Sequence, residues 1–152
     1  MSSATVAEGA AAVLRPLRQS DVEAVARWYD KATVLAGSPV PLGDLLNPAD
    51  RWRSMVLTES GHQEPVALLV VALDDPKPAW ATVALLAIAR QEEQDIAALG
   101  VALLEARLRG EASHVRASVP RDVGLALYFW LRLGYRPVVS GQGLWMISDL
   151  EA

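Results

Sequence analysis

The sequence predicts an α/β domain, and three of its features carry this prediction. The run 66–73 is apolar on both faces and 79–88 is a second long apolar run, as expected of central strands. The segment 96–109 repeats apolar residues at helical spacing. The segment 123–137 is too apolar for a surface loop, and Gly134 stands where the end of a helix needs a left-handed residue. We therefore expect a buried helix that ends at Gly134 and leads directly into a strand.

Length and composition indicate a single folded domain. The chain has 152 residues, of which 52% are hydrophobic and 21% charged, which excludes a disordered protein. We expect a flexible N-terminus over 1–11 and one domain over 12–152. Because the sequence has no cysteine, disulfides, thiolate metal sites and a cysteine nucleophile are excluded. The two histidines are far apart in sequence, so we predict no metal site.

Charge and hydropathy limit the partners that we expect. The net charge of −4 and the lack of a basic cluster argue against nucleic-acid binding. No apolar segment approaches the roughly 20 residues of a membrane span, and the small, polar N-terminus does not read as a signal peptide. The sequence thus predicts a cytoplasmic protein without membrane contact.

The first third of the chain begins with a strand and a helix. Residues 12–17 read as a strand whose end is marked by Pro16. Ser20 and Glu23 have the spacing of a capping box, which predicts a helix that starts at Ser20. Its apolar face is formed by Val22, Val25, Ala26 and Tyr29.

The next segment is predicted to be mostly irregular. The stretch 33–46 contains two glycines and two prolines, so we expect a loop with little regular structure. Asn47 and Pro48 suit the N-cap and first position of a short helix that reaches Arg53.

The remainder alternates strands and helices. Runs 55–58 and 66–73 form a predicted hairpin, and 79–88 follows after a turn. The helix over 96–109 ends at Gly110, and its buried face is expected to comprise Leu99, Ala102, Leu103 and Ala106. Further strands are expected at 114–119, directly after Gly134 and at 144–147.

Two stretches resemble a known family. The pattern Ala-x-x-Phe-Trp-x-Arg-Leu-Gly-Tyr over 126–135 resembles the helix-to-strand signature near the C-terminus of the GNAT superfamily of N-acetyltransferases. The opening Leu-Arg-Pro-Leu-Arg-x-x-Asp over 14–21, with Arg-Trp-Tyr at 27–29, is similar to the first strand and helix of that family. The resemblance spans the chain from Val13 onward. It implies a mixed, mostly antiparallel sheet of about six or seven strands with helices on both faces.

The resemblance also implies acetyl-CoA as cosubstrate, held in a splay beside the strand that ends near Ile88. The pyrophosphate would lie on backbone N–H groups at the start of the 96–109 helix. Aligned with the family's loop, Asp95 takes the place of an arginine, and the cofactor-binding positions are Ala98, Leu99, Gly100 and Val101. Acidic residues at 92–95 would repel a phosphate, and an alternative role for Asp95 is the N-cap of the helix.

Candidate catalytic residues depart from the family's pattern. Trp130 stands where the family usually has a tyrosine that protonates the thiolate of CoA, and Val123 where it often has an asparagine. The candidates that remain are Tyr128 as acid, unless it packs in the core; His114 as base, unless it is a surface residue; and Ser118 near the acyl group, unless it is an ordinary sheet serine. For the substrate pocket we single out Tyr29, Trp52 and Trp80.

Two functions follow from these observations. The first is an acyl-CoA-dependent N-acyltransferase that acts on a small-molecule or peptide amine. The second is a catalytically inactive GNAT-like module for ligand or protein binding, with the apolar run 144–147 in a possible homodimer interface.

Overall fold

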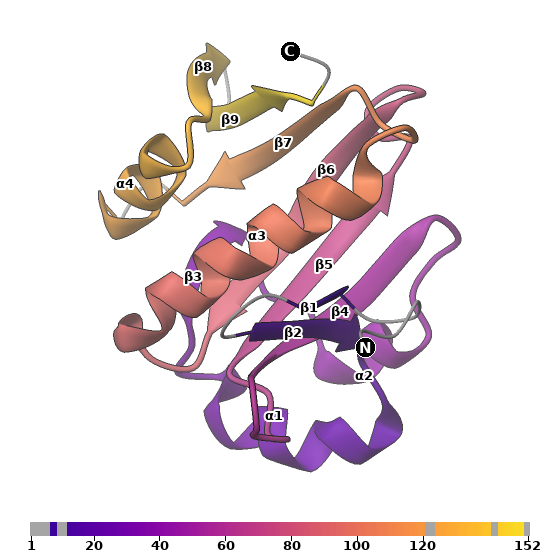
Figure 1. The fold of residues 1–152 in the computed structure, drawn as a ribbon, viewed down its shortest axis with the longest axis vertical. Helices are drawn as coiled ribbons and strands as arrows, with labels where there is room; N and C mark the ends of the chain where they lie inside the picture. Colours follow the sequence, from indigo (N-terminus) through magenta and orange to yellow (C-terminus); the bar gives the residue numbers. More distant parts are fainter. Residues whose placement is uncertain (1–6, 9–11, 121–123, 141–142, 151–152) are drawn as a thin grey trace.

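The computed structural model describes residues 7–8, 12–120, 124–140 and 143–150. In this part of the chain all strands belong to one mixed sheet, ordered β1-β2-β4-β5-β6-β7-β9-β8, with β3 paired to β6 off this path (Figure 1). The strands are β1 (Ala7–Glu8), β2 (Ala12–Pro16), β3 (Thr33–Gly37), β4 (Trp52–Glu59), β5 (Ala67–Leu73), β6 (Trp80–Ile88), β7 (His114–Val119), β8 (Arg136–Ser140) and β9 (Gly143–Asp149). The helices are α1 (Val22–Tyr29), α2 (Leu42–Leu46), α3 (Gln94–Leu108) and α4 (Gly124–Arg132), with 3₁₀ turns at Gln19–Asp21 and Gln91–Glu93.

The predicted fold class is confirmed, and two strands were missed. The sheet is antiparallel except for the parallel pair β6 and β7. β1 lies within the segment 1–11 and pairs with β2; nothing in its composition indicates a strand. β3 was predicted to be loop, because Gly37 and the following prolines read as turn residues. The rest of 1–11 lies outside the described residues.

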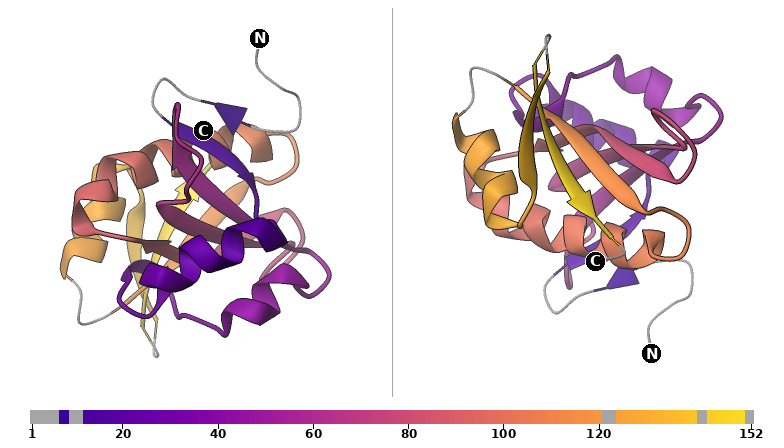
Figure 2. Two further views of the ribbon diagram at one scale, coloured as in Figure 1. Left: turned by 90° about the horizontal axis from the view of Figure 1, so that it is seen from below. Right: turned by 90° about the horizontal axis from the view of Figure 1, so that it is seen from above.

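The helices cover both faces of the sheet, as the resemblance implies. α3 and α4 lie on one side, and α1 and α2 lie on the other (Figure 2). The central strand β5 is buried from Ala67 to Ala72, which confirms that it is covered on both faces. Among the described residues, no helix combines the length and the apolar composition that crossing a membrane requires.

Three local predictions in the first half are wrong. Ser20 is not the N-cap of α1: it lies inside a 3₁₀ turn, and the carboxylate of Asp21 accepts the hydrogen bond from the Arg18 N–H instead, at 2.8 Å. The segment 33–46 is not irregular, since it holds β3 and α2. The short helix expected from Asn47 to Arg53 does not form there, because Trp52 and Arg53 already pair with β5.

The buried face of α3 also differs from the prediction. Ala102 and Ala106 are exposed, and Leu99 and Leu103 are only partly buried. The face against the sheet consists of Ile96, Ala97, Gly100, Val101, Leu104 and Leu108. The helix is apolar almost all round, so helical spacing alone could not identify the buried side.

The junction at Gly134 has the predicted form. Gly134 has φ +89°, α4 ends two residues earlier, and β8 begins two residues later. Tyr135 is 2% exposed, and its hydroxyl donates a hydrogen bond of 2.6 Å to the Glu105 carboxylate on α3. Burial, followed by the Glu105 charge, raises the pKa of the Tyr135 hydroxyl, so it remains a protonated donor. This contact ties the signature to the helix that would hold a pyrophosphate.

Tyr135→Phe is expected to destabilise the fold by about 1.5–3 kcal/mol, because it removes a buried hydrogen bond to a charged group. Urea denaturation of the two proteins measures the difference. Tyr128→Phe is the matched control, since Tyr128 is 67% exposed and should leave stability unchanged. Equal stability of Tyr135→Phe and the unaltered protein would show that the Glu105 contact contributes nothing.

Candidate functional site

The strands β6 and β7 separate halfway along their length. They pair in parallel only from Trp80 with His114 to Val83 with Ala117. Beyond this point β7 continues on its other edge with β9, up to Val119. This separation is the splay that the resemblance assigns to the acyl-CoA, beside the strand that ends at Ile88.

The splay is filled by β3, a segment of the same chain. β3 pairs antiparallel with the second half of β6, from Thr33 opposite Ile88 to Gly37 opposite Leu85 (Figure 1). Ile88 also pairs with Ala67 of β5, so both of its edges are used. The backbone edge of β6 that would receive an acyl-CoA arm is therefore already occupied.

Trp130 holds β3 in this position. A bulge between Val34 and Ala36 leaves Leu35 outside the regular strand pairing. The indole Nε1 of Trp130 donates a buried hydrogen bond of 2.7 Å to the Leu35 carbonyl, which satisfies this otherwise unpaired group. Trp130 is 0% exposed. The residue at the family's tyrosine position thus has a structural contact with β3.

Gly37 allows the end of β3 to approach β6 closely. Its φ is +72°, and a Cβ at this position would lie 1.8 Å from the carbonyl oxygen of Ala84. No larger residue fits between the two backbones. The sequence does contain a signal for this contact, but a glycine followed by Pro39 and Pro41 is more typical of a loop.

The predicted pyrophosphate positions are inside α3, not at its start. α3 begins at Gln94, so Ala98, Leu99, Gly100 and Val101 are its fifth to eighth residues. Their N–H groups bond to carbonyls four residues back and are not available to a phosphate. Gly100 serves packing instead, since a Cβ there would lie 2.3 Å from a methyl group of Leu57 on β4.

The start of α3 carries acidic side chains. Asp95 is exposed in the first turn and is not the N-cap, a position that Glu93 occupies without a capping hydrogen bond. The Glu93 carboxylate is buried and accepts a hydrogen bond of 2.8 Å from Arg90. Gln94, Asp95 and Ala98 line a small cavity of about 80 Å³ against α4, together with Phe129, Arg132 and Leu133.

The candidate acid and base do not meet at the splay. Tyr128 is 67% exposed on α4, so the core packing considered as its alternative is wrong, while its role as the acid stays a prediction. His114 stacks on Trp80 with 4.4 Å between ring centroids, at the start of both strands. That position is roughly 20 Å along β6 from Leu86, given the rise of a strand. His114 and Trp80 therefore lie at the wrong end of the sheet for the predicted site.

Ser118 is the predicted catalytic residue that lies at the splay. It comes directly after the last residue of β7 that pairs with β6 and is partly buried. Buried residues alternate with it on β7, so Ser118 faces away from the side covered by α3 and α4. Val123, at the position where the family often has an asparagine, lies outside the described residues.

The remaining predicted substrate residues lie in two different places. Trp52 begins β4 and lines an apolar cavity of about 300 Å³ near the C-terminal end of α3, away from the splay. Tyr29 ends α1, and its hydroxyl donates to the Val40 carbonyl at 2.7 Å and accepts from the Val40 N–H at 3.1 Å. It thereby anchors the chain that leaves β3, beside a cavity of about 390 Å³.

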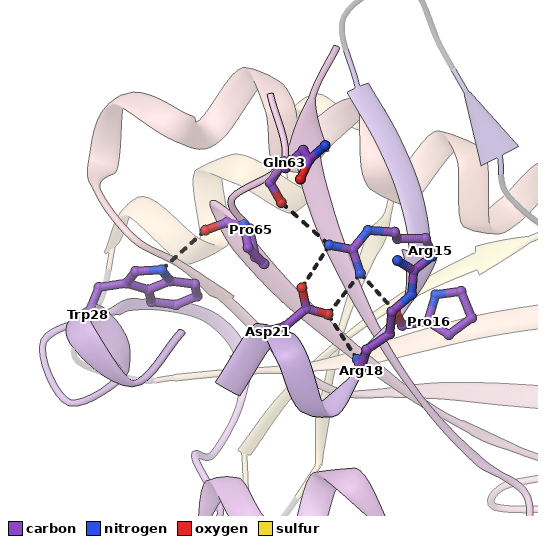
Figure 3. Close-up of polar contacts among 7 residues, drawn as sticks. All are labelled: Arg15, Pro16, Arg18, Asp21, Trp28, Gln63 and Pro65. Carbon is purple, nitrogen blue, oxygen red and sulfur yellow. Dashed lines mark hydrogen bonds and ion pairs between the residues drawn. The ribbon is translucent and has the colours of Figure 1, made fainter. Parts of the chain in front are cut away.

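A charged cluster near α1 was not predicted as a site. Arg15 of β2 makes two hydrogen bonds to Asp21, at 2.7 and 2.8 Å, beside a cavity of about 560 Å³ (Figure 3). Burial tends to raise the pKa of Asp21, but hydrogen bonds from Arg15 and the Arg18 N–H outweigh it and hold the pKa below its usual range. Because both charges are satisfied by each other, the cluster joins β2 to α1 and offers no free catalytic group. Both residues belong to the stretch 14–21 that carries the family resemblance.

The described residues do not fit an acyl-CoA arm in this conformation. β3 takes the backbone edge of β6, Trp130 fills the position of the family's acid, and Asp95 adds negative charge where a pyrophosphate would lie. Within the described ranges, no three His, Asp or Glu side chains are grouped so that they could hold a metal ion.

The overall structure is similar to those of acetyltransferases. An acetyltransferase from Thermus thermophilus is 26% identical over 91% of this chain and 96% of its own, with a TM-score of 0.68. The ribosomal-protein-S18-alanine N-acetyltransferase from Escherichia coli is 17% identical over 91% and 94%, with a TM-score of 0.63. An acetyltransferase from Agrobacterium tumefaciens is 15% identical over 98% and 96%, with a TM-score of 0.70.

No protein-family model matches the chain, and no curated protein matches it either. The similarity to these solved structures nevertheless extends over 91% to 98% of the chain. This protein therefore has the GNAT fold, as the resemblance of its C-terminal signature predicts.

Proposed function

We propose that this protein is an acyl-CoA-dependent N-acyltransferase of the GNAT type that acts on a primary amine. The observation that carries the proposal is the splay between β6 and β7, together with a fold shared over most of the chain with an acetyltransferase that is 26% identical. In this reaction a C–N bond forms as the thioester C–S bond breaks, and the proton lost by the amine balances the CoA thiolate. The substrate is a small-molecule or peptide amine, and acetyl-CoA is the proposed donor.

The acceptor would enter from the side of α1 and α2. Tyr29 and Val40 line a cavity on that side, and Ser118 faces the same side of the sheet. Burial raises the pKa of the Tyr29 hydroxyl, so it is neutral and positions the chain after β3 without acting as a base. The described strands that border the splay, β3, the second half of β6 and the end of β7, carry no carboxylate or imidazole there, so the proposed reaction relies on the positioning of a neutral amine.

A second function is favoured by the occupied splay. If β3 never leaves β6, the chain is a GNAT-fold module that binds a ligand or protein without acyl transfer. Trp130 supports this alternative, because it replaces the family's acid and is committed to β3. The two functions differ in one measurable property, which is the binding of acyl-CoA.

Asp95→Asn is expected to bind acetyl-CoA about two- to five-fold more tightly than the unaltered protein. A carboxylate in the first turn of α3 opposes a phosphate there by about 0.5–1 kcal/mol, and the amide removes this repulsion. Isothermal titration with acetyl-CoA and CoA measures the effect, and an amine panel with thiol detection tests turnover. Asp44→Asn is the matched control, because Asp44 is also an acidic residue in the first turn of a helix, but that helix is α2 and not α3.

The titration separates the two functions. Binding by the unaltered protein that tightens in Asp95→Asn and not in Asp44→Asn supports an acyl-CoA site at the start of α3. If neither variant nor the unaltered protein binds acetyl-CoA at millimolar concentration, the acyltransferase proposal is wrong and the binding module is the function that remains.

A further inference from the structure

We propose that β3 is an internal occupant of the acyl-CoA position and has to leave β6 before an acyl-CoA can bind. This inference rests on the proposed function, because it names what controls access to the same splay. It is carried by three properties of β3: its backbone pairing, the burial of its side chains, and the way in which both ends of the segment are held.

The backbone of β3 completes β6 by strand addition. Four residue pairs join the strands at the point where β7 has diverged, so β3 continues the edge that β7 vacates. An extended ligand that binds a strand edge uses the same N–H and C=O groups. β3 and an acyl-CoA arm on this edge are therefore mutually exclusive.

The side chains of β3 fill the space on both faces of the splay. Leu35 and Ala36 are 0% exposed and belong to the core between the sheet and α3 and α4. Val34 packs on the opposite side with the cluster around Leu45 and Val56. β3 is thus packed like any core strand.

Both ends of the β3 segment are held by contacts that can be released locally. Before β3, the N–H groups of Lys31 and Ala32 bond to the last turn of α1. After β3, the chain runs from Gly37 to Val40, and the backbone C=O and N–H of Val40 both bond to the Tyr29 hydroxyl. Among the described strands β3 pairs only with β6, so its departure removes no pairing between the other strands.

Competition between β3 and acyl-CoA reduces the apparent affinity. If the splay is open in only a fraction of molecules, the apparent dissociation constant is the intrinsic one divided by that fraction. Any change that weakens β3 without touching the rest of the splay therefore tightens acyl-CoA binding. This property distinguishes an occupant from a wall of the site, whose loss would weaken binding.

Leu35→Ala is expected to tighten acetyl-CoA binding at least about ten-fold. Leu35 is buried while β3 is paired with β6, so its truncation destabilises this closed state and not the open state that binds acetyl-CoA. The matched control is Leu14→Ala, which truncates an equally buried leucine of the same core in β2, distant from β6 in the sheet. It should lose comparable stability in urea and leave acetyl-CoA binding unchanged. Tighter binding by both variants, or by neither, would contradict the inference.

A reversible lock tests the same point in the opposite direction. Val34 and Ala87 are opposite each other in the β3–β6 pair, at a spacing that a disulfide can bridge. The unaltered chain has no cysteine, so an introduced pair could bond only with each other. The double variant Val34→Cys with Ala87→Cys should bind acetyl-CoA when reduced and lose binding when oxidised. Binding that is equal in both states, with the disulfide verified by mass, would overturn the inference.

Hydrogen exchange makes failure of this inference distinguishable from failure of the proposed function. With millimolar acetyl-CoA, the amides of 33–37 should exchange faster while those of β5 do not change. Acetyl-CoA binding with 33–37 still protected means that β3 is no obstacle, although the function stands. If Leu35→Ala exposes 33–37 to exchange and still binds no acetyl-CoA, the splay is open and the proposed function itself is wrong.

Discussion

Gly37→Ala is expected to destabilise the protein by about 3 kcal/mol or more. A left-handed backbone at φ +72° costs a non-glycine residue about 1–2 kcal/mol, and the added Cβ would also lie 1.8 Å from the Ala84 carbonyl oxygen. That oxygen belongs to the backbone of β6 and cannot move aside without breaking the sheet. The strain is relieved only when β3 moves away from β6, which exposes Leu35 and Ala36.

Gly61→Ala separates the two contributions. Gly61 also has a positive φ, of +88°, but a Cβ there meets nothing within 4 Å. It should therefore cost only the backbone strain of about 1–2 kcal/mol. Urea denaturation gives both values, and hydrogen exchange at 33–37 shows whether β3 is released in Gly37→Ala. If the two alanine variants are equally stable, Gly37 is not in close contact with β6.

Asp21→Ala is expected to destabilise the protein by about 3 kcal/mol, because it leaves the charge of Arg15 partly buried without its partner. The side chains of Arg15 and Asp21 are 12% and 6% exposed, and the same carboxylate accepts the Arg18 N–H at the start of the first helix. The value is at the low end of the usual range, since Arg15 lies beside an open cavity. Glu64→Ala is the control: its pair with Arg27 is exposed and should contribute less than about 1 kcal/mol.

The same carboxylate sets part of the acid stability. The pKa of Asp21 is lowered in the folded protein, so its contribution is fully present above the unfolded value of about 3.9. The contribution is lost as the pH falls below that value and through the folded pKa. The stability difference between the unaltered protein and Asp21→Asn should therefore be constant near neutral pH and shrink below about pH 4. A difference that is independent of pH down to full protonation would show that the pair does not lower this pKa.

Much of the fold could be predicted from local sequence. β5 and β6 are long apolar runs, and Gly134 marks the end of α4, so these elements followed from periodicity and from one backbone requirement. The predicted start of a helix was wrong where several neighbouring polar residues could each have capped it. Ser20, Asp21 and Glu23 could all serve the start of α1, and the choice of Asp21 depends on Arg15, which is distant in the first strand.

The candidate site was harder to predict than the fold. His114, Trp80 and Trp52 were chosen for their chemistry, and the sheet places them away from the splay. Tyr128 was chosen as the tyrosine nearest to the family's position, but the turn of α4 directs it into solvent. Ser118 and Tyr29 remain near the splay because their elements, β7 and α1, flank it.

The sequence by itself determined the fold class, the order of the main elements, the junction at Gly134 and the acidic start of α3, because each depends on neighbouring residues. Only the tertiary structure decided what fills the splay. β3 is a strand because β7 diverges from β6 and leaves a backbone edge unpaired, and because Trp130, almost a hundred residues later, satisfies the Leu35 carbonyl. No local pattern encodes such a contact, since the strand exists only where the distant edge is available to pair with it.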